Sequence, residues 1–499
     1  MVRISKCHVR VGDGDVASKI DFGERVWSIM RGARNVLLAT VCAAILLPDT
    51  AHAISLKAAI KIALEANPDI GEAIANREAI EFELRQARGL YLPSVDGEAR
   101  YGVQRFDSPG TRTSGTSDDD LQRREVRGVL TQRVFDGFNR RGERHRQASR
   151  VDSASHRIYE RSEFIALNIV RQYLEAGRLL KIVQFSNENI AYHKRILSDL
   201  KEGESGGSIS IADRQQAEER VIAAEARLIE TTEDLNGAKI RFFKLVGKPL
   251  DHFQAPSSVT SALPRGLSQA LGIARTSNPL IKIAKANLDA ARSQIKQARS
   301  EFYPKVDIEL QGRKGNDLEG VQGRESELRA ELVMRWNIFR GGIDRATVQE
   351  QVRRSDEERY GLRRAHREVE ETVRLSWDRQ VQQRRRYARL RDQLASVERL
   401  LVSYAEQFKV GDRSLLDLLD TQNTRFNTQI SVETGRSALE FAEYRVLASI
   451  GMLLNTLRIT APVQSDSYAR AEHRVPETPD GEKERRMKPG HRWSTRRSR

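Results

Sequence analysis

An internal duplication of nearly the whole chain constrains the fold more than any other feature of the sequence. The stretch ALEANPDIGEAIANREAIEFELRQARGLYLPSVD, around residue 67, is matched 211 positions later by IARTSNPLIKIAKANLDAARSQIKQARSEFYPKVD. Further along the offset becomes 204, where FDGFNRRG (135–142) matches FRGGID (339–344). Two copies of one structural unit therefore follow each other, a first repeat at 54–250 and a second at 266–460, joined by a linker at 251–265.

The matched positions include residues with special backbone roles. Asparagine followed by proline supplies a helix N-cap and a proline suited to the first helical turn. The second proline of each repeat ends that helix, because the residue before a proline avoids helical geometry. The matched glycines mark the breaks that follow. The repeat-defining residues are Asn67, Pro68, Pro93, Gly137 and Gly207 in the first copy, and Asn278, Pro279, Pro304 and Gly341 in the second.

Four segments have the alternating pattern of β-strands, at about 94–106, 123–135, 305–313 and 326–337. In the third, Val306, Ile308 and Leu310 alternate with charged or polar residues, whereas Val129 and Gln132 break the alternation in the second. One apolar and one polar face is typical of a transmembrane β-barrel wall, although hairpins of a soluble sheet packed on helices give the same pattern. Four strands cannot close a barrel, and an open edge in lipid leaves backbone groups unpaired, so we expect several copies to assemble.

Long stretches almost free of proline and glycine follow each pair of strands, and they predict helical hairpins at about 138–247 and 345–457. A sixty-residue helix would be about 90 Å long at about 1.5 Å per residue. Apolar residues recur every three or four positions, as at Leu167, Val170 and Leu174. This spacing favours coiled-coil-like lateral packing, with an ordinary helical bundle as the alternative.

The N-terminal region has the pattern of an export signal. Residues 30–53 contain two arginines, an apolar run at 36–47 and the small-x-small sequence Ala-His-Ala at 51–53. The run is too short to span a bilayer. We therefore expect residues 1–53 to be an N-terminal extension and signal peptide, with Met30 as an alternative start to Met1 and a mature chain beginning at about Ile54. Cys7 and Cys42 both fall in the removed part, so no disulfide or cysteine metal site is expected.

The charge of the chain, formally +15, is spread along solvated helices. The arginine-rich RRRYARLRDQ (384–393) has acidic residues close by, which favours a helix face in water over nucleic-acid binding. The tail at 461–499 is basic and lacks apolar periodicity, so it is predicted to be disordered. No catalytic, metal or cofactor site is predicted, because no phosphate-binding glycine loop or catalytic triad order stands out. The histidines lack metal-like spacing; His145, His156, His193 and His366 are scattered on predicted helix surfaces.

The duplicated NP…QAR…P pattern, the FDG and FRGG breaks and the stretch GDRSLLDLLD (411–420) together resemble the TolC family of outer-membrane channel proteins over about 54–460. The resemblance implies an α+β membrane protein: a homotrimer with a twelve-stranded β-barrel in outer-membrane lipid and a long-helix tunnel through the periplasm. It also implies a periplasmic adaptor (membrane fusion) protein and an inner-membrane transporter of the ABC or RND type as partners. The cargo would be exported proteins or small molecules.

Three functions are considered for this chain. QARGLYLPSVD (86–96) is most similar to the branch that serves type I protein secretion. A multidrug efflux channel is the alternative. A soluble periplasmic coiled-coil scaffold or adaptor is the third possibility, and it would lack lipid-facing strands.

The stretch 408–420 matches a family motif that forms the periplasmic gate, of the form aromatic-x-x-Gly-x-Arg-x-x-x-Asp-x-x-Asp. The matching residues are Phe408, Gly411, Arg413, Asp417 and Asp420. The resemblance implies that the aspartates of all subunits form acidic rings narrowing the entrance, and that the arginine links its coil to a neighbour.

The motif has a counterpart in the first hairpin and departs from the family pattern at one position. Asp213, in GSISIAD (207–213), is the partner acid of the first hairpin, and Phe408 replaces the expected tyrosine, so a hydroxyl-mediated link is absent. An aspartate in a first helical turn also stabilises its helix by about 0.3–1 kcal/mol. That alternative explains Asp417 and Asp213, but not Asp420, which lies one turn deeper among leucines.

Overall fold

The computed structural model describes residues 54–205 and 210–479. The predicted signal region, Gly207 and residues 480–499 lie outside the described residues. The first repeat contains α2 (Leu56–Ala66), α3 (Pro68–Gly89), β1 (Ser94–Gln104), α4 (Pro109–Ser114), β2 (Leu121–Phe135), α5 (Asn139–Ser205) and α6 (Ile211–Val246). After η1 (Thr260–Ala262), the second contains α7 (Leu267–Ser277), α8 (Pro279–Arg299), η2 (Ser300–Phe302), β3 (Lys305–Asn316), β4 (Arg324–Arg335), α9 (Ile343–Lys409) and α10 (Leu415–Ser449). Three short elements end the described chain: α11 (Leu453–Thr456), η3 (Val463–Ser465) and α12 (Ala469–Glu472).

The four strands form one antiparallel sheet in the order β1-β2-β3-β4, so the two repeats join at β2 and β3. The register aligns residues of one kind across all four strands. One ladder is apolar and runs through Val95, Leu130, Leu310 and Ala330. Another is charged and runs through Glu98, Arg127, Arg313 and Glu327. Since side chains alternate between the faces of a sheet, one face is apolar and the opposite face is charged.

The apolar face is strongly exposed in the single chain. Leu328 is 88% exposed and Leu332 is 72% exposed. The opposite face is held by ion pairs: the buried carboxylate of Asp307 lies 2.9 Å from Arg133 and 3.2 Å from Arg335. A sheet that pairs its charges on one face and exposes leucines on the other is suited to an apolar solvent on the leucine side.

The two Asn-Pro pairs have the same structural role in the two repeats. Asn67 caps α3 by accepting a hydrogen bond from the Asp69 N–H (3.0 Å), and its side-chain amide donates to the Leu245 carbonyl near the end of α6 (3.0 Å). Asn278 likewise caps α8 and donates to the Ser449 carbonyl at the end of α10 (2.9 Å). Each asparagine therefore starts one helix and ties it to the end of the following hairpin.

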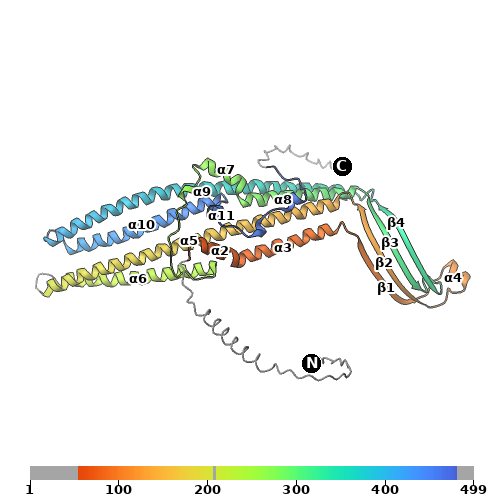
Figure 1. Cartoon of the computed structure of the whole chain (residues 1–499), viewed down its shortest axis with the longest axis horizontal. Coiled ribbons are helices and arrows are strands. Elements are labelled where there is room, and N and C mark those ends of the chain that lie inside the picture. Colours follow the sequence, from red (N-terminus) through yellow and green to blue (C-terminus); the bar gives the residue numbers. More distant parts are fainter. Residues whose placement is uncertain (1–53, 206–209, 480–499) are drawn as a thin grey trace, which may run out of the picture. The chain divides into compact units, whose positions relative to one another are not determined.

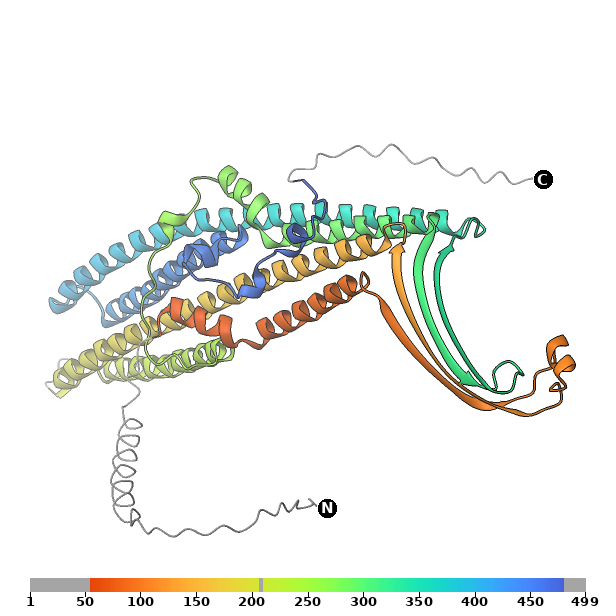
Figure 2. The same ribbon diagram turned by 45° about the vertical axis from the view of Figure 1, so that its right-hand side comes forward.

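Long helices run side by side along the molecule, away from the strands (Figures 1 and 2). Helices α5 and α6 form one antiparallel hairpin and α9 and α10 the other, and α5 and α9 are both 67 residues long. Helix α8 packs between α5 and α9, whereas α3 packs on α5 and no second long helix packs extensively on it in the described chain. No helix within residues 54–205 and 210–479 is long and apolar enough to cross a lipid bilayer.

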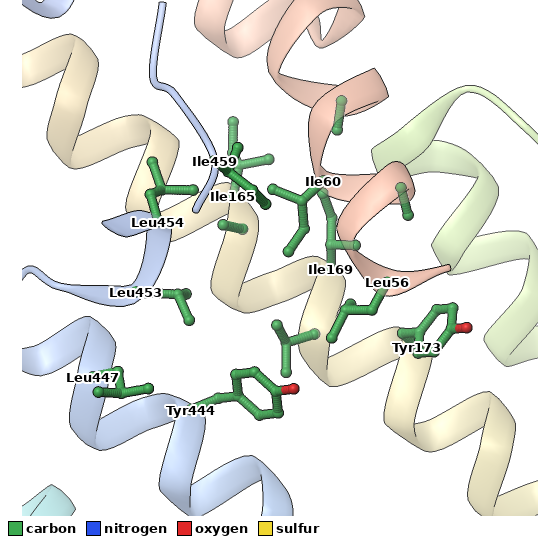
Figure 3. Close-up of a cluster of buried hydrophobic side chains, with 14 of the residues drawn as sticks. Leu56, Ile60, Ile165, Ile169, Tyr173, Tyr444, Leu447, Leu453, Leu454 and Ile459 are labelled. Atoms are coloured by element: carbon green, nitrogen blue, oxygen red, sulfur yellow. The ribbon is translucent and has the colours of Figure 1, made fainter. Parts of the chain in front are cut away.

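The largest apolar core lies where α2, α5, α10 and α11 meet (Figure 3). Ile60 of α2, Ile169 of α5 and Leu453 of α11 are almost fully buried there. Tyr173 contributes its ring to this core, and its hydroxyl donates to the Gln254 carbonyl at 2.7 Å. This core therefore fixes the linker and the first residues of the described chain against both hairpins.

The prediction of a disordered tail from residue 461 was wrong for residues 461–479, which fold back on the helices. Arg470 is buried, with Nε 2.9 Å from Asp152 of α5 and Nη1 2.9 Å from Asp289 of α8. Asp152 also accepts hydrogen bonds from backbone N–H groups at the start of α12, and Asp289 accepts from the N–H and hydroxyl of Thr478. Buried ion pairs with distant residues, and not an apolar pattern, hold this segment, and the sequence pattern therefore did not reveal it.

Candidate functional site

The turn between α9 and α10 is a closed helix end built around Gly411. The Asp412 N–H donates to the Gln407 carbonyl (2.9 Å), and the Gly411 N–H donates to the Phe408 carbonyl (3.1 Å). These two bonds are those of a Schellman motif, which needs a left-handed residue after the helix. Gly411 has a φ of 81°, a conformation that only glycine adopts without strain. The glycine therefore fixes where α9 stops and α10 can begin.

The tips of both hairpins carry the same helix cap. The Ser414 hydroxyl accepts a hydrogen bond from the Asp417 N–H (3.2 Å) and donates to the Asp417 carboxylate (2.9 Å). Ser210 and Asp213 make the same pair of contacts at the start of α6, at 3.2 and 2.7 Å. Both aspartates thus stabilise the first turn of their helix, close to the positive end of its dipole.

Arg413 is held within its own hairpin. Its Nε donates to the Gln407 side chain (3.1 Å), and its guanidinium lies 4.5 Å from the centre of the Tyr404 ring and 3.8 Å from the Asp417 carboxylate. A guanidinium over an aromatic face gains a cation–π attraction. In the single chain these contacts brace the turn, and the link from Arg413 to a neighbouring subunit stays a prediction.

Asp420 connects the two hairpins. Its carboxylate lies 3.2 Å from Arg220 of α6, and both side chains are partly exposed. The sequence pattern does not reveal Arg220, because the two residues are 200 positions apart and follow no local spacing. The one indirect sign in the sequence is the position of Asp420, which lies one turn beyond the first helical turn, where an acid would act as a helix cap.

A small apolar cluster lies beneath these polar residues. Leu200 and Ala217 of the first hairpin pack with Leu415 and Leu419 of the second, and Phe408 packs against them. Phe408 therefore has an apolar packing role. Near the tips, the side chain of Gln422 donates to that of Asn189 at 2.8 Å in a buried position. Within residues 54–205 and 210–479, the hairpins are joined here by the Arg220–Asp420 pair, this apolar cluster and the Gln422–Asn189 hydrogen bond.

Five of the predicted gate residues come together at the α9–α10 tip, namely Phe408, Gly411, Arg413, Asp417 and Asp420, and the sixth, Asp213, lies at the tip of the other hairpin. Their chemistry is that of an exposed acidic surface with two arginines. Within the described residues no three histidine, cysteine or acidic side chains are grouped so that they could hold a metal ion.

Comparison with known proteins places this architecture. The family model described as outer membrane efflux protein matches residues 59–248 and 270–452. The chain belongs to the outer membrane efflux protein family. The predicted resemblance to TolC-type channels, the predicted fold class and the predicted outer-membrane location are therefore confirmed, with the helical part extending into the periplasm.

Curated relatives and solved structures agree with this placement. The outer membrane efflux protein BepC of Brucella suis is 25% identical over 446 residues, covering 87% of this chain and 94% of that protein. The outer membrane protein TolC of Escherichia coli is 21% identical over 438 residues, covering 83% and 86%. The alkaline protease secretion protein AprF of Pseudomonas aeruginosa is 22% identical over 395 residues, covering 77% and 81%. The crystal structure of the outer membrane protein VceC of Vibrio cholerae superposes with a TM-score of 0.67 at 16% identity, covering 80% of this chain and 96% of that one.

Proposed function

We propose that this protein assembles into a closed trimer that forms a duct from the periplasm across the outer membrane. The observation that carries the proposal is a difference between the two copies of the repeat. Helix α8 has long neighbours on both sides, α5 and α9. Within the described residues its counterpart α3 has one long neighbour, α5, and otherwise contacts the short α2 and the segment around α12. Ala286 of α8 is fully buried, while the matching Ala75 of α3 is exposed. The same α3 face carries Phe82, which is 57% exposed.

In the repeat, α3 corresponds to α8 and α9 corresponds to α5. Because α5 packs on α8 within the chain, α9 of a second copy can pack on α3 in the same way. The sheet supports the same arrangement, because β1 and β4 are its two outer strands and β4 of one copy can pair with β1 of the next. Such head-to-tail contacts form a ring when the rotation closes. The resemblance to the TolC family supports a ring of three copies, which would contain twelve strands.

Cysteine cross-linking tests this ring. Ser153 of α5 and Asn287 of α8 are hydrogen bonded at 2.7 Å within one chain. The matching positions are Glu357 of α9 and Asn76 of α3, which the ring brings together between copies. The variant N76C/E357C should cross-link into a species of three chains under mild oxidation. The variant S153C/N287C is the matched control, and its cross-link should stay within one chain. Monomeric N76C/E357C protein alongside an efficiently cross-linked control would exclude the ring.

Within the ring, the apolar face of the sheet would contact lipid and the charged face would line a water-filled channel. The hairpin tips would form the periplasmic entrance, where Asp417 and Asp420 of each copy make acidic rings. A periplasmic adaptor and an inner-membrane transporter of the ABC or RND type would dock there and supply energy, since nothing in the described fold resembles a nucleotide site.

The proposed cargo is protein, delivered by a type I secretion transporter. Two observations support it: the similarity of QARGLYLPSVD to that branch, and the similarity of the whole chain to a protein named for alkaline protease secretion. Deletion of the gene should remove one or a few proteins from the secreted proteome, and re-expression should restore them.

Multidrug efflux is the second candidate, and the match to the efflux protein BepC over most of both chains favours it. The deletion strain separates the two functions. If the secreted proteome stays unchanged and antibiotic sensitivity increases, the function is multidrug efflux and not protein secretion.

A further inference from the structure

A cavity of about 800 Å³ lies beside the segment that follows α10, and the channel function does not use it. Its walls come from three places: the middle of α5, the junction of α7 and α8, and residues 451–467. The last wall exists because the segment 461–479 folds back, held by the ion pairs of Arg470 with Asp152 and Asp289. The cavity is therefore part of the folded structure and not a gap between loose segments.

The cavity is lined by basic side chains without acidic partners. Lys282 of α8 and Arg458 both line it, the latter with an exposed side chain, and no ion pair of either is found among residues 54–205 and 210–479. Lys282 is half-buried, and burial lowers the pKa of its ammonium group. The acidic side chain on the walls is Asp466, which is exposed and pairs with neither of them.

His156, on the α5 wall, lies near the same positive charges. Burial, followed by the nearby charges of Arg470 and Lys282, lowers the pKa of His156 to about 4. The opposing charge of Asp152 does not compensate for these effects. Lys282 is a partly buried cation without a counter-charge, which is destabilising, and a bound anion would remove that penalty. Arg458 is exposed at the rim and would add a second positive charge.

The remaining lining adds hydrogen-bonding groups around these cations. Ser277, Asn455 and Thr460 contribute two hydroxyls and an amide to the walls. Two cations surrounded by neutral hydrogen-bonding groups match the charge and the acceptor oxygens of a phosphate or a carboxylate. The volume admits a small organic molecule as well as a single ion.

We propose that this cavity binds a small soluble oxyanion, a phosphate or carboxylate compound held by Lys282 and Arg458. A lipid headgroup is a poor fit. Lys282 lies 17 residues before Arg299, the last residue of α8. At about 1.5 Å per residue, it is therefore more than about 20 Å from the strand that follows. The ligand therefore reaches the site from the aqueous periplasm. This inference holds whether the exported cargo is protein or a small molecule.

Titration calorimetry on the purified full-length mature protein in detergent tests the proposal, with inorganic phosphate and succinate as probes at pH 7. The changes are Lys282→Gln and Arg458→Asn. Asparagine suits position 458, where φ is 53°, because it tolerates the left-handed region better than most residues. Lys296→Gln is the matched control, since Lys296 is exposed on the same helix and does not line the cavity.

Saturable binding of at least one probe is expected, weakened tenfold or more by each cavity change and unaffected by Lys296→Gln. Thermal unfolding of each variant shows whether the fold is intact. No saturable binding of either probe, or equal weakening in the Lys296→Gln control, would overturn the site. Binding of vesicles that contain phosphatidic acid, without binding of the soluble probes, would overturn the claim that the ligand is soluble.

Discussion

The two repeats are built from the same elements, yet matched positions have different surroundings. A β-carbon placed on Gly137, after β2, would lie 2.6 Å from the Ser300 carbonyl oxygen and 2.8 Å from Tyr303. A β-carbon on the matching Gly341, after β4, would meet nothing within 4 Å. Both glycines have positive φ, 64° and 60°. The turn after β2 in the first repeat therefore packs against the second repeat. The matching turn after β4 in the second repeat has no packing partner within the single chain.

The first way to break this comparison is to change the two glycines to alanine. Gly137→Ala should lower the free energy of unfolding by about 2–5 kcal/mol, from left-handed strain and a close contact with backbone. Gly341→Ala should cost about the same in the assembled ring, because the turn at 89–92 of a neighbouring copy is expected to pack there. Urea unfolding of the detergent-solubilised protein measures both. A Gly341→Ala cost of only about 1–2 kcal/mol, that of strain alone, would show that no neighbour occupies this turn.

The strands give the second test, because the apolar ladder is continuous across both repeats. Arginine in place of Leu310, Leu328 or Leu332 should destabilise the membrane-inserted protein by roughly 2–4 kcal/mol near the bilayer midplane. Thr131→Arg is the control, since Thr131 pairs with Glu309 on the charged face. Resistance of the assembled protein to heat and urea in outer-membrane fractions is the measurement. Leucine variants that all assemble like the unchanged protein would contradict a lipid-facing ladder.

The sequence predicted the elements that depend on local pattern. The Asn-Pro caps, the alternating strands and the glycine turns are visible in short windows, so their positions follow from the residues alone. The fold of 461–479 was missed because Arg470 finds its partners, Asp152 and Asp289, in distant helices. Arg220 at the hairpin tips was missed for the same reason. Ion pairs between remote segments leave no periodic signal, whereas apolar faces and caps do.

The long helices α5 and α9 also differ in how their matched residues affect the pH dependence of stability. Burial raises the pKa of Glu163 on α5 to about 7, although its carboxylate accepts hydrogen bonds from the N–H groups of Leu453 and Leu454. The matching residue of α9 is Arg367, which is exposed. The unfolded chain ionises its glutamate first, so stability falls as pH rises from about 4.3 to about 7, by at most about 4 kcal/mol.

Glu163→Gln should remove this loss of stability between pH 4.3 and 7. His156 acts in the opposite direction over a similar window: its lowered pKa, about 4, adds stability as pH rises toward 6.5. The Glu163→Gln variant should therefore become relatively more stable at neutral than at acidic pH. Unfolding midpoints measured from pH 4 to 8 test the sign, and the same pH profile in both proteins would contradict the assigned ionisation of Glu163.

The smallest expected effects are at the hairpin tips, where the repeats share a cap but differ in one acid. Asp213 and Asp417 match, whereas the position matching Asp420 in the first repeat is Gln216. The partly exposed pair of Asp420 with Arg220 contributes at most about 1 kcal/mol. Arg220→Gln should therefore leave stability almost unchanged but loosen the link between hairpins, raising single-channel conductance in planar bilayers. Arg413→Ser should also raise conductance by weakening the turn, and Phe408→Tyr should lower it.

Charge selectivity separates a gate from a helix cap. Acidic rings attract cations, so Asp417→Ala with Asp420→Ala should weaken cation preference and block by multivalent cations. Arg220→Gln should strengthen cation preference, because it frees the Asp420 carboxylate from its counter-charge. Asp213→Ala is the control for a lost helix cap, and it should change selectivity least if the second hairpin alone forms the constriction. Equal cation preference in the double variant and the unchanged protein would show that GDRSLLDLLD only starts a helix, and that the extra acid of the second repeat serves to join the two hairpins.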